Sequence, residues 1–219
     1  MTANAAPDLN DWWNSYRVAY DQRTWLDYRN LLAEAVRHAS GPPLLDVGCG
    51  YGFLVECCRQ FGMAATGLES STHALAESRS RHPLADVRAW TAGERLPFES
   101  LSFGAVMLNQ VVDHLTRDEN RSLFGEAHRV LRKDGVLLAF SPSRYNSFEV
   151  DTGHVTFFSP SEFRAFVEGF GFDVITQPYH LQPIFGQSRL GQMAAGALSR
   201  VYRPERWAAT IDLVGVRRS

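Results

Sequence analysis

Three glycines and two acids have types and spacing suited to holding a ribose-containing cofactor. Gly48, Gly50 and Gly52 alternate with other residues just after an apolar run, and Asp46 stands two residues before the first of them. Glycine lets a backbone turn sharply and approach a bound group closely. Glu69 follows about 20 residues after the glycines, the distance at which an acid accepts hydrogens from ribose hydroxyls. The pattern predicts a cofactor-binding turn.

Two details decide between a dinucleotide and an adenosyl cofactor. A dinucleotide fingerprint needs its third glycine at position 53, where this chain has Phe53. The carboxylate of Asp46 beside the turn would also repel an anionic pyrophosphate. S-adenosyl-L-methionine carries a sulfonium and an ammonium and no phosphate, so an acid is useful to it. We therefore predict S-adenosyl-L-methionine as the cofactor and keep an NAD-dependent oxidoreductase as a less favoured alternative.

The elements that would position these residues alternate between strand and helix patterns. This alternation predicts βαβ units and a parallel sheet with right-handed crossovers. The predicted fold class is α/β: a Rossmann-like, seven-stranded, mostly parallel doubly wound sheet with an antiparallel last strand and an N-terminal helical lead-in. Strands are expected at 43–47, 63–69, 85–90, 103–109, 135–141, 173–181 and 209–218, and helices at 53–62, 71–81, 121–132 and 159–172.

Length, charge and cysteine content narrow the class of protein. The 219 residues, 45% of them hydrophobic, suit one domain, in which we expect a helical lid or lead-in (1–40), a cofactor-binding core (41–142) and an acceptor-side region (143–219). A net charge of −2 without a Lys/Arg cluster argues against nucleic acid or an anionic membrane as partner. No secretory segment or apolar run of about 20 residues occurs. The three cysteines suit a reducing compartment, so a cytoplasmic location is expected. The oligomeric state is left open.

At these motifs the chain resembles the class I S-adenosylmethionine-dependent methyltransferases. Their motif is an apolar strand followed by D/E-x-G-x-G-x-G, and the stretches ATGLESS, LPFESLSFGAVMLNQVVDHL and EAHRVLRKDGVLLAFSPS match their later motifs. The resemblance implies backbone contacts from the glycines to the methionine part, Glu69 on the ribose and Asn109 at the amino end. Ala92 departs from the family by replacing an acid that accepts the adenine amino group. The implied cofactor-binding residues are Arg29, Asp46, Gly48, Cys49, Gly50, Gly52, Glu69, Ser70, Ala92 and Asn109.

Within that superfamily the chain is similar to the ubiquinone-biosynthesis O-methyltransferases. The pair Trp12-Trp13, the spacing from it to Arg29, and the later stretch TGHVTFFSPSEF carry this likeness. The implied role of Arg29 is a planar fork on the cofactor carboxylate. The alternative is an arginine on a solvated helix face.

The same likeness bears on how an acceptor would be activated. Those enzymes carry E-x-x-E-H, which can hold a divalent metal, but here Gln110 replaces the first carboxylate, so we expect no metal. A hydroxyl acceptor then needs a histidine base. His154 is the first candidate, with Asp151 as its possible orienting partner, and the other predicted catalytic residues are His114 and Asp113.

The predicted activity is methyl transfer to a small molecule at a hydroxyl oxygen. A non-catalytic S-adenosylmethionine-binding protein is the other alternative, because Ala92 and Gln110 both depart from the family pattern. The acceptor itself has no sequence signal that we can interpret.

Overall fold

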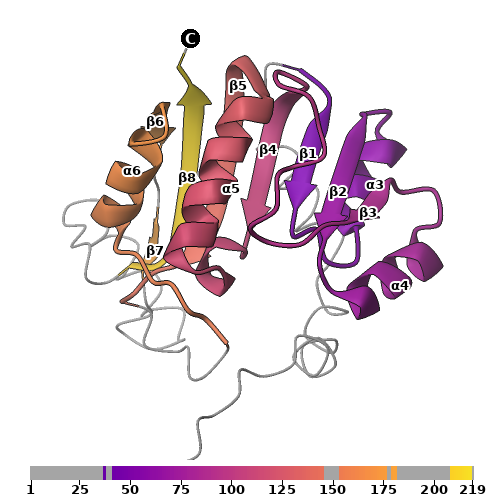
Figure 1. Ribbon diagram of the computed structural model, residues 1–219, viewed down its shortest axis with the longest axis horizontal. Coiled ribbons are helices and arrows are strands. Elements are labelled where there is room, and N and C mark those ends of the chain that lie inside the picture. Colours follow the sequence, from indigo (N-terminus) through magenta and orange to yellow (C-terminus); the bar gives the residue numbers. More distant parts are fainter. Residues whose placement is uncertain (1–36, 38–40, 146–152, 177–178, 182–207, 219) are drawn as a thin grey trace, which may run out of the picture.

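The chain folds around one twisted sheet, shown here in a computed structural model (Figure 1). The structure describes residue 37 and residues 41–145, 153–176, 179–181 and 208–218. The strand order is β3-β2-β1-β4-β5-β8-β6, with the short β7 also paired to β8. The strands are β1 (Leu44–Val47), β2 (Ala65–Glu69), β3 (Val87–Ala89), β4 (Phe103–Asn109), β5 (Leu131–Pro142), β6 (Phe172–Thr176), β7 (Tyr179–Leu181) and β8 (Ala208–Arg217).

Strand directions confirm the predicted fold class. β1 to β5 pair in parallel, whereas β8 runs antiparallel to both β5 and β6. The sixth predicted strand, 173–181, is present as two pieces on the same edge of β8: Asp173 pairs with Val216, and Tyr179 pairs with Ile211. The sheet therefore has seven positions, as predicted, with the last position filled by β6 and then β7.

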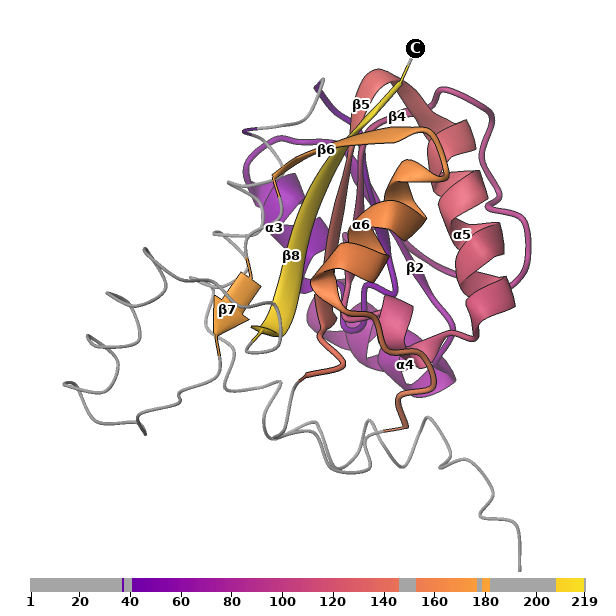
Figure 2. The ribbon, with the colours of Figure 1, turned by 90° about the vertical axis from the view of Figure 1, so that its left-hand side faces the viewer.

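Alternate residues of the central strands face two helical layers. Figure 2 shows α3 (Phe53–Gln60) on one side of the sheet and α5 (Arg117–Val130) and α6 (Pro160–Glu168) on the other. Because side chains alternate across a strand, Leu44 packs with α3, while Leu45 packs with α5 and α6. A fourth helix, α4 (Thr72–Arg81), adds Ala74 to the α3 layer. Helices therefore cover both faces of the sheet, which is the predicted doubly wound arrangement.

The helix starts show which local signals the sequence carried. Ser71 caps α4 by accepting from the Ala74 N–H at 3.2 Å. The third helix was predicted at 121–132 but spans Arg117–Val130, because Thr116 and Glu119 form a capping box that begins it four residues earlier. β5 also begins four residues earlier than predicted, at Leu131, which pairs with Phe103. Within this strand Asp134 has a left-handed φ of 59°.

Parts of the predicted organisation lie outside the described residues. These are the helical lead-in, except residue 37, and most of the segment between β7 and β8. Within the part that the structure describes, no helix is long and apolar enough to cross a membrane.

The α5 capping box gives a first test of local stability. Thr116→Ala removes the side-chain oxygen that accepts the Glu119 N–H. We expect this variant to lower the free energy of unfolding by about 1 kcal/mol, the usual cost of losing such a cap. Urea titration followed by circular dichroism measures it, and an unchanged midpoint would show that the box contributes nothing.

Candidate cofactor and catalytic site

The glycine-rich turn lies between β1 and α3, where the strand order reverses. β1 pairs with β2 on one side and with β4 on the other, so the turn occupies the switch point at which open α/β sheets bind ligands. Gly48, Gly50 and Gly52 have φ values of 72°, 55° and 75°. A Cβ on Gly48 would collide with the side chain of Val111, which follows β4. Glycine at position 48 is therefore required both by backbone conformation and by the close approach of a neighbouring segment.

The N–H groups of this turn are used inside the protein. Those of Gly48 and Cys49 both donate to the Leu68 carbonyl, at 2.8 and 3.0 Å, and that of Gly52 donates to the Cys49 carbonyl. The Gly50 N–H donates to Glu69 Oε2 at 2.9 Å. A phosphate-binding turn needs such groups directed at its anion. The four N–H groups named here already have acceptors, so none of them is available to a phosphate.

Glu69 connects the turn after β1 to the turn after β2. Besides the Gly50 N–H, its carboxylate accepts the N–H groups of Ser70 and Ser71, both at 2.8 Å. Burial raises the pKa of Glu69, while these three donations oppose the rise. The carboxylate thus reaches the end of β2 in a fixed orientation, as a group that accepts from ribose hydroxyls must.

Asp46 is a second buried acid beneath the same turn. It is 4% exposed, and burial together with the nearby charge of Glu69 raises its pKa to about 8. A buried carboxyl of this kind favours a cationic ligand, because a nearby positive charge stabilises its ionised form. The raised pKa is consistent with a sulfonium or ammonium group as its partner.

The other predicted cofactor residues lie at the same edge of the sheet. Ser70 is exposed just after β2, Asn109 ends β4 partly buried, and Ala92 follows β3 and packs against the core. The Cys49 side chain packs toward Gly67, where a Cβ would lie 2.6 Å from its sulfur, so only its backbone could face a ligand. Arg29 lies outside the described residues.

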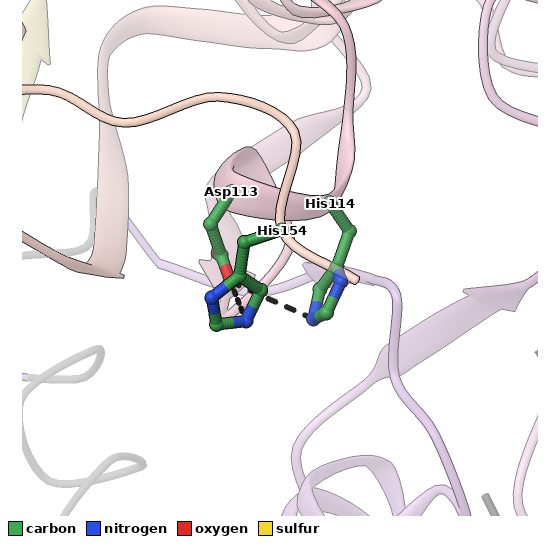
Figure 3. Close-up of side chains that lie close together, drawn as sticks. All are labelled: Asp113, His114 and His154. Carbon is green, nitrogen blue, oxygen red and sulfur yellow. Dashed lines mark ion pairs between the residues drawn. The ribbon is translucent and has the colours of Figure 1, made fainter. Parts of the chain in front are cut away.

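The three predicted catalytic residues form one cluster (Figure 3). His154 Nε2 lies 2.8 Å from Asp113 Oδ2, and His114 Nε2 lies 3.5 Å from the same oxygen. The two imidazole rings meet edge to face with centroids 4.6 Å apart. Asp113 is fully buried, and the His154 side chain is 7% exposed. Residues 40 positions apart in sequence are thus in contact.

Two segments supply this cluster. Asp113 and His114 lie in η1 (Val112–His114), a 3₁₀ turn that follows β4 at the end of the sheet where the glycine-rich turn lies. His154 lies in the segment that leads to α6, and this segment is fastened to η1 because the Asp113 carbonyl accepts the N–H groups of Val155 and Thr156. The sequence suggested Asp151 as a partner of His154. Asp151 lies outside the described residues, so this pairing stays a prediction; among the described residues, Asp113 lies close to the imidazole.

The cluster contains imidazole groups that could act as a base, and its imidazole and carboxylate groups could also ligate a metal. Burial lowers the pKa of His114, which favours its neutral form, although Asp113 opposes this shift. One ligand atom from each of the three residues lies within 4.8 Å of the others, and both side-chain oxygens of Asp113 are buried. Two imidazoles and a carboxylate fit a divalent transition metal. Gln110 supplies a neutral amide in place of the carboxylate expected in metal-using relatives, and it holds a left-handed φ of 58°.

Fold and site together define a Rossmann-like cofactor-binding domain with an acid and two histidines beside the cofactor edge. Residues 45–139 match the protein family described as a methyltransferase domain. The predicted family resemblance is confirmed.

Individual relatives agree with this assignment. A Mycobacterium tuberculosis protein named as an S-adenosylmethionine-dependent methyltransferase is 28% identical over 141 residues, covering 63% of this chain and 46% of its own length. A ubiquinone biosynthesis O-methyltransferase of Bradyrhizobium is 28% identical over 116 residues, covering 51% of this chain and 44% of its own length. The matched region thus spans about half of these relatives.

Solved structures agree on the fold. The crystal structure of an S-adenosylmethionine-dependent methyltransferase from Archaeoglobus fulgidus superposes with a TM-score of 0.70 at 16% identity, covering 96% of this chain and all of that one. The predicted cofactor, S-adenosyl-L-methionine, is borne out by the family and by the names of the relatives.

The buried Asp46 makes the stability of the cofactor-free protein depend on pH. Its pKa is about 8 in the fold against 3.8 as the ordinary value, so the folded state holds a proton that the unfolded chain has lost between these values. Stability from this group therefore falls as pH rises from about 4 to about 8. Asp46→Asn should flatten that slope and stabilise the protein at the alkaline end, as measured by thermal unfolding at several pH values.

A matched control is Asp86→Asn. Arg88 holds the pKa of Asp86 below its ordinary value, so this carboxylate is ionised throughout the same range and its loss should leave the slope unchanged. Equal slopes in wild type and Asp46→Asn would show that Asp46 is ionised in the free protein.

Proposed function

We propose that this protein transfers the methyl group of S-adenosyl-L-methionine to a hydroxyl oxygen of a small molecule. The observation that carries the proposal is the combination of two features at one end of the sheet. One is the glycine-rich turn beside the buried Asp46, four of whose N–H groups have acceptors within the protein, and the other is the Asp113-His114-His154 cluster. Val111 links them, since it packs over Gly48 and stands two residues before Asp113.

The cofactor half of the site accounts for the choice of ligand. Glu69 would accept from the ribose, and the Asp46 carboxylate would lie beneath the cationic methionine part. Asn109 would contact the amino end and Arg29 the cofactor carboxylate. NAD is disfavoured because its pyrophosphate would meet turn N–H groups that already have acceptors, together with the Asp46 carboxyl.

Methyl transfer is an in-line displacement at a carbon that the sulfonium already activates. The protein's main contribution is therefore to align acceptor oxygen and methyl group and to exclude water. The acceptor hydroxyl must also lose its proton, and His154 is the proposed base. Nε2 lies 2.8 Å from Asp113 Oδ2, so in the proposed tautomer Nε2 carries a proton directed at this carboxylate and Nδ1 is the nitrogen that takes the acceptor's proton. His114 is the second candidate for this role.

A metal-assisted route is a second candidate, favoured by the spacing of the three ligand atoms. Asp113, His114 and His154 would hold the divalent ion, which when bound would lower the pKa of the acceptor hydroxyl. We favour the histidine route because Gln110 leaves the cluster one carboxylate short of the metal-using pattern. A protein that binds the cofactor without catalysis is the remaining alternative, and the paired acid and imidazole argue against it.

Cofactor binding is the first test of the proposal. Isothermal titration calorimetry should detect S-adenosylmethionine and its demethylated product, S-adenosylhomocysteine, and no binding of NAD. Glu69→Ala should weaken the product complex by about 1.5–3 kcal/mol, the value of hydrogen bonds to a charged acceptor. Glu77→Ala, which removes a carboxylate paired with Arg81 on α4, is the control and should bind normally. Binding of NAD without any response to either sulfur compound would overturn the proposed cofactor.

The base is tested by turnover on the best hydroxyl acceptor from a screen of phenols, sugars and hydroxy acids. His154→Gln should reduce turnover about 10²–10⁴-fold, the range for a positioned acid or base, with little change in S-adenosylhomocysteine affinity. His128→Gln, in the last turn of α5 and packed on Phe172, should leave turnover intact. Complete loss of wild-type activity with a chelator, restored by a divalent ion, would favour the metal route instead.

A further inference from the structure

Asn120 is a buried amide in the second turn of α5, outside every motif discussed above. It is 0% exposed. Its Nδ2 donates to the carbonyls of Val112 at 2.8 Å and Leu115 at 3.1 Å. These two carbonyls stand on either side of Asp113 and His114. One amide group therefore spans the short segment that carries two of the three cluster residues.

The η1 turn needs such external support. It has three residues, and the backbone bond that closes it is the donation from the His114 N–H to the Val111 carbonyl at 3.1 Å. The segment enters through Gln110, whose φ of 58° is uncommon for a residue with a side chain. A single 3₁₀ turn after such an entry does not fix its own orientation strongly, because most of its carbonyls lack partners within the turn.

The position of η1 determines where His154 lies, because hydrogen bonds and a close side-chain contact join the two segments. The Asp113 carbonyl accepts the Val155 N–H at 2.8 Å and the Thr156 N–H at 3.1 Å. Asp113 Oδ2 is also the atom that lies 2.8 Å from His154 Nε2. A rotation or shift of η1 would therefore move the carboxylate and the segment bearing His154 together.

Packing alone does not explain an amide at this position. Asn120 Oδ1 is buried and has no hydrogen-bond partner among the described residues, which is unfavourable in an apolar core. Its neighbours along α5, Leu123 and Phe124, are apolar and fully packed. A leucine at position 120 would avoid the unsatisfied oxygen but would leave the carbonyls of Val112 and Leu115 without the donor that Asn120 supplies.

We propose that Asn120 is a positioning residue, which fixes η1 so that Asp113 holds His154 in one orientation and tautomer. This inference deepens the proposed function, on which it rests, by adding a residue that acts through the cluster and touches neither cofactor nor acceptor.

The test compares Asn120→Leu with wild type by nitrogen NMR of histidine-labelled protein at one fixed alkaline pH, without cofactor. His154 signals are assigned from their loss in His154→Gln, and Asp113→Asn provides the spectrum of His154 without its carboxylate. We expect wild type to show a single Nε2–H tautomer for His154. In Asn120→Leu the His154 signals should move toward those of Asp113→Asn. Thr116→Ala, which weakens the same helix through its cap, should match wild type.

Two further measurements separate positioning from loss of structure. S-adenosylhomocysteine affinity should stay within about twofold of wild type, because Asn120 donates to the carbonyls of Val112 and Leu115 and to no residue of the glycine-rich turn. Turnover on the screened acceptor should fall about 10–10²-fold, the cost of a small misplacement of reacting groups. If Asn120→Leu does not fold, Asn120→Ser removes the same donations with a smaller polar side chain and should give the same shift.

Wild-type His154 signals in a folded Asn120 variant would overturn the inference and leave Asn120 as a packing residue. The same holds if Thr116→Ala shifts the signals equally, because the effect would then follow from helix stability. Failure of the wild-type protein to bind S-adenosylhomocysteine would instead count against the proposed function, since the NMR comparison needs no cofactor.

Discussion

The parallel pairing of β1 with β2 on one side and β4 on the other is the constraint on which the site depends. It brings the carboxyl ends of three strands to one edge, and each of these ends contributes a functional segment. The turn after β1 reaches the carboxylate at the end of β2 through the 2.9 Å bond from Gly50 to Glu69. The segment after β4 packs over Gly48 through Val111. Any change of register between these strands would separate all three.

Buried acids at this edge carry an energetic cost that a cationic ligand can offset. Asp46 and Glu69 are both almost fully buried, and burial raises the pKa of each. Glu69 is satisfied by three backbone donors, whereas the pKa of Asp46 rises to about 8. The two acids therefore differ in role. The Glu69 carboxylate connects two turns, whereas the ionised form of Asp46 needs a positive group to stabilise it. A turn of this kind differs in chemistry from the phosphate-binding turn at the same place in dinucleotide-binding folds.

The catalytic half of the proposed site is built from weaker local structure. A three-residue 3₁₀ turn and an extended segment hold Asp113, His114 and His154, and the bonds between the two segments all involve Asp113 or His114. Such segments allow side chains from distant parts of the chain to meet, but they need anchors on regular elements. Asn120 on α5 anchors η1, and the Ser159 capping box fixes the start of α6, to which the segment bearing His154 leads.

The sequence by itself determined the sheet and the cofactor turn, because both depend on local signals. Short apolar runs defined the strands, and the alternation with helices predicted their parallel direction. The spacing of Asp46, the glycines and Glu69 defined the turn and its ligand class, and the family and relatives agree with it. Helix boundaries depend on capping residues as well as on apolar periodicity, and the Thr116 capping box begins α5 four residues before the predicted start.

Only the tertiary structure decided how the acceptor-side residues meet. Asp113 and His154 are 41 positions apart, and their contact depends on the path of the chain after β5 and on the bonds from Val155 and Thr156 to the Asp113 carbonyl. The sequence suggested only the local partner Asp151, which lies outside the described residues. Asn120 shows the same limit, because an asparagine on an amphipathic helix has no sequence signal until its two acceptor carbonyls are located. Contacts of this kind depend on long-range packing, which residue spacing does not encode.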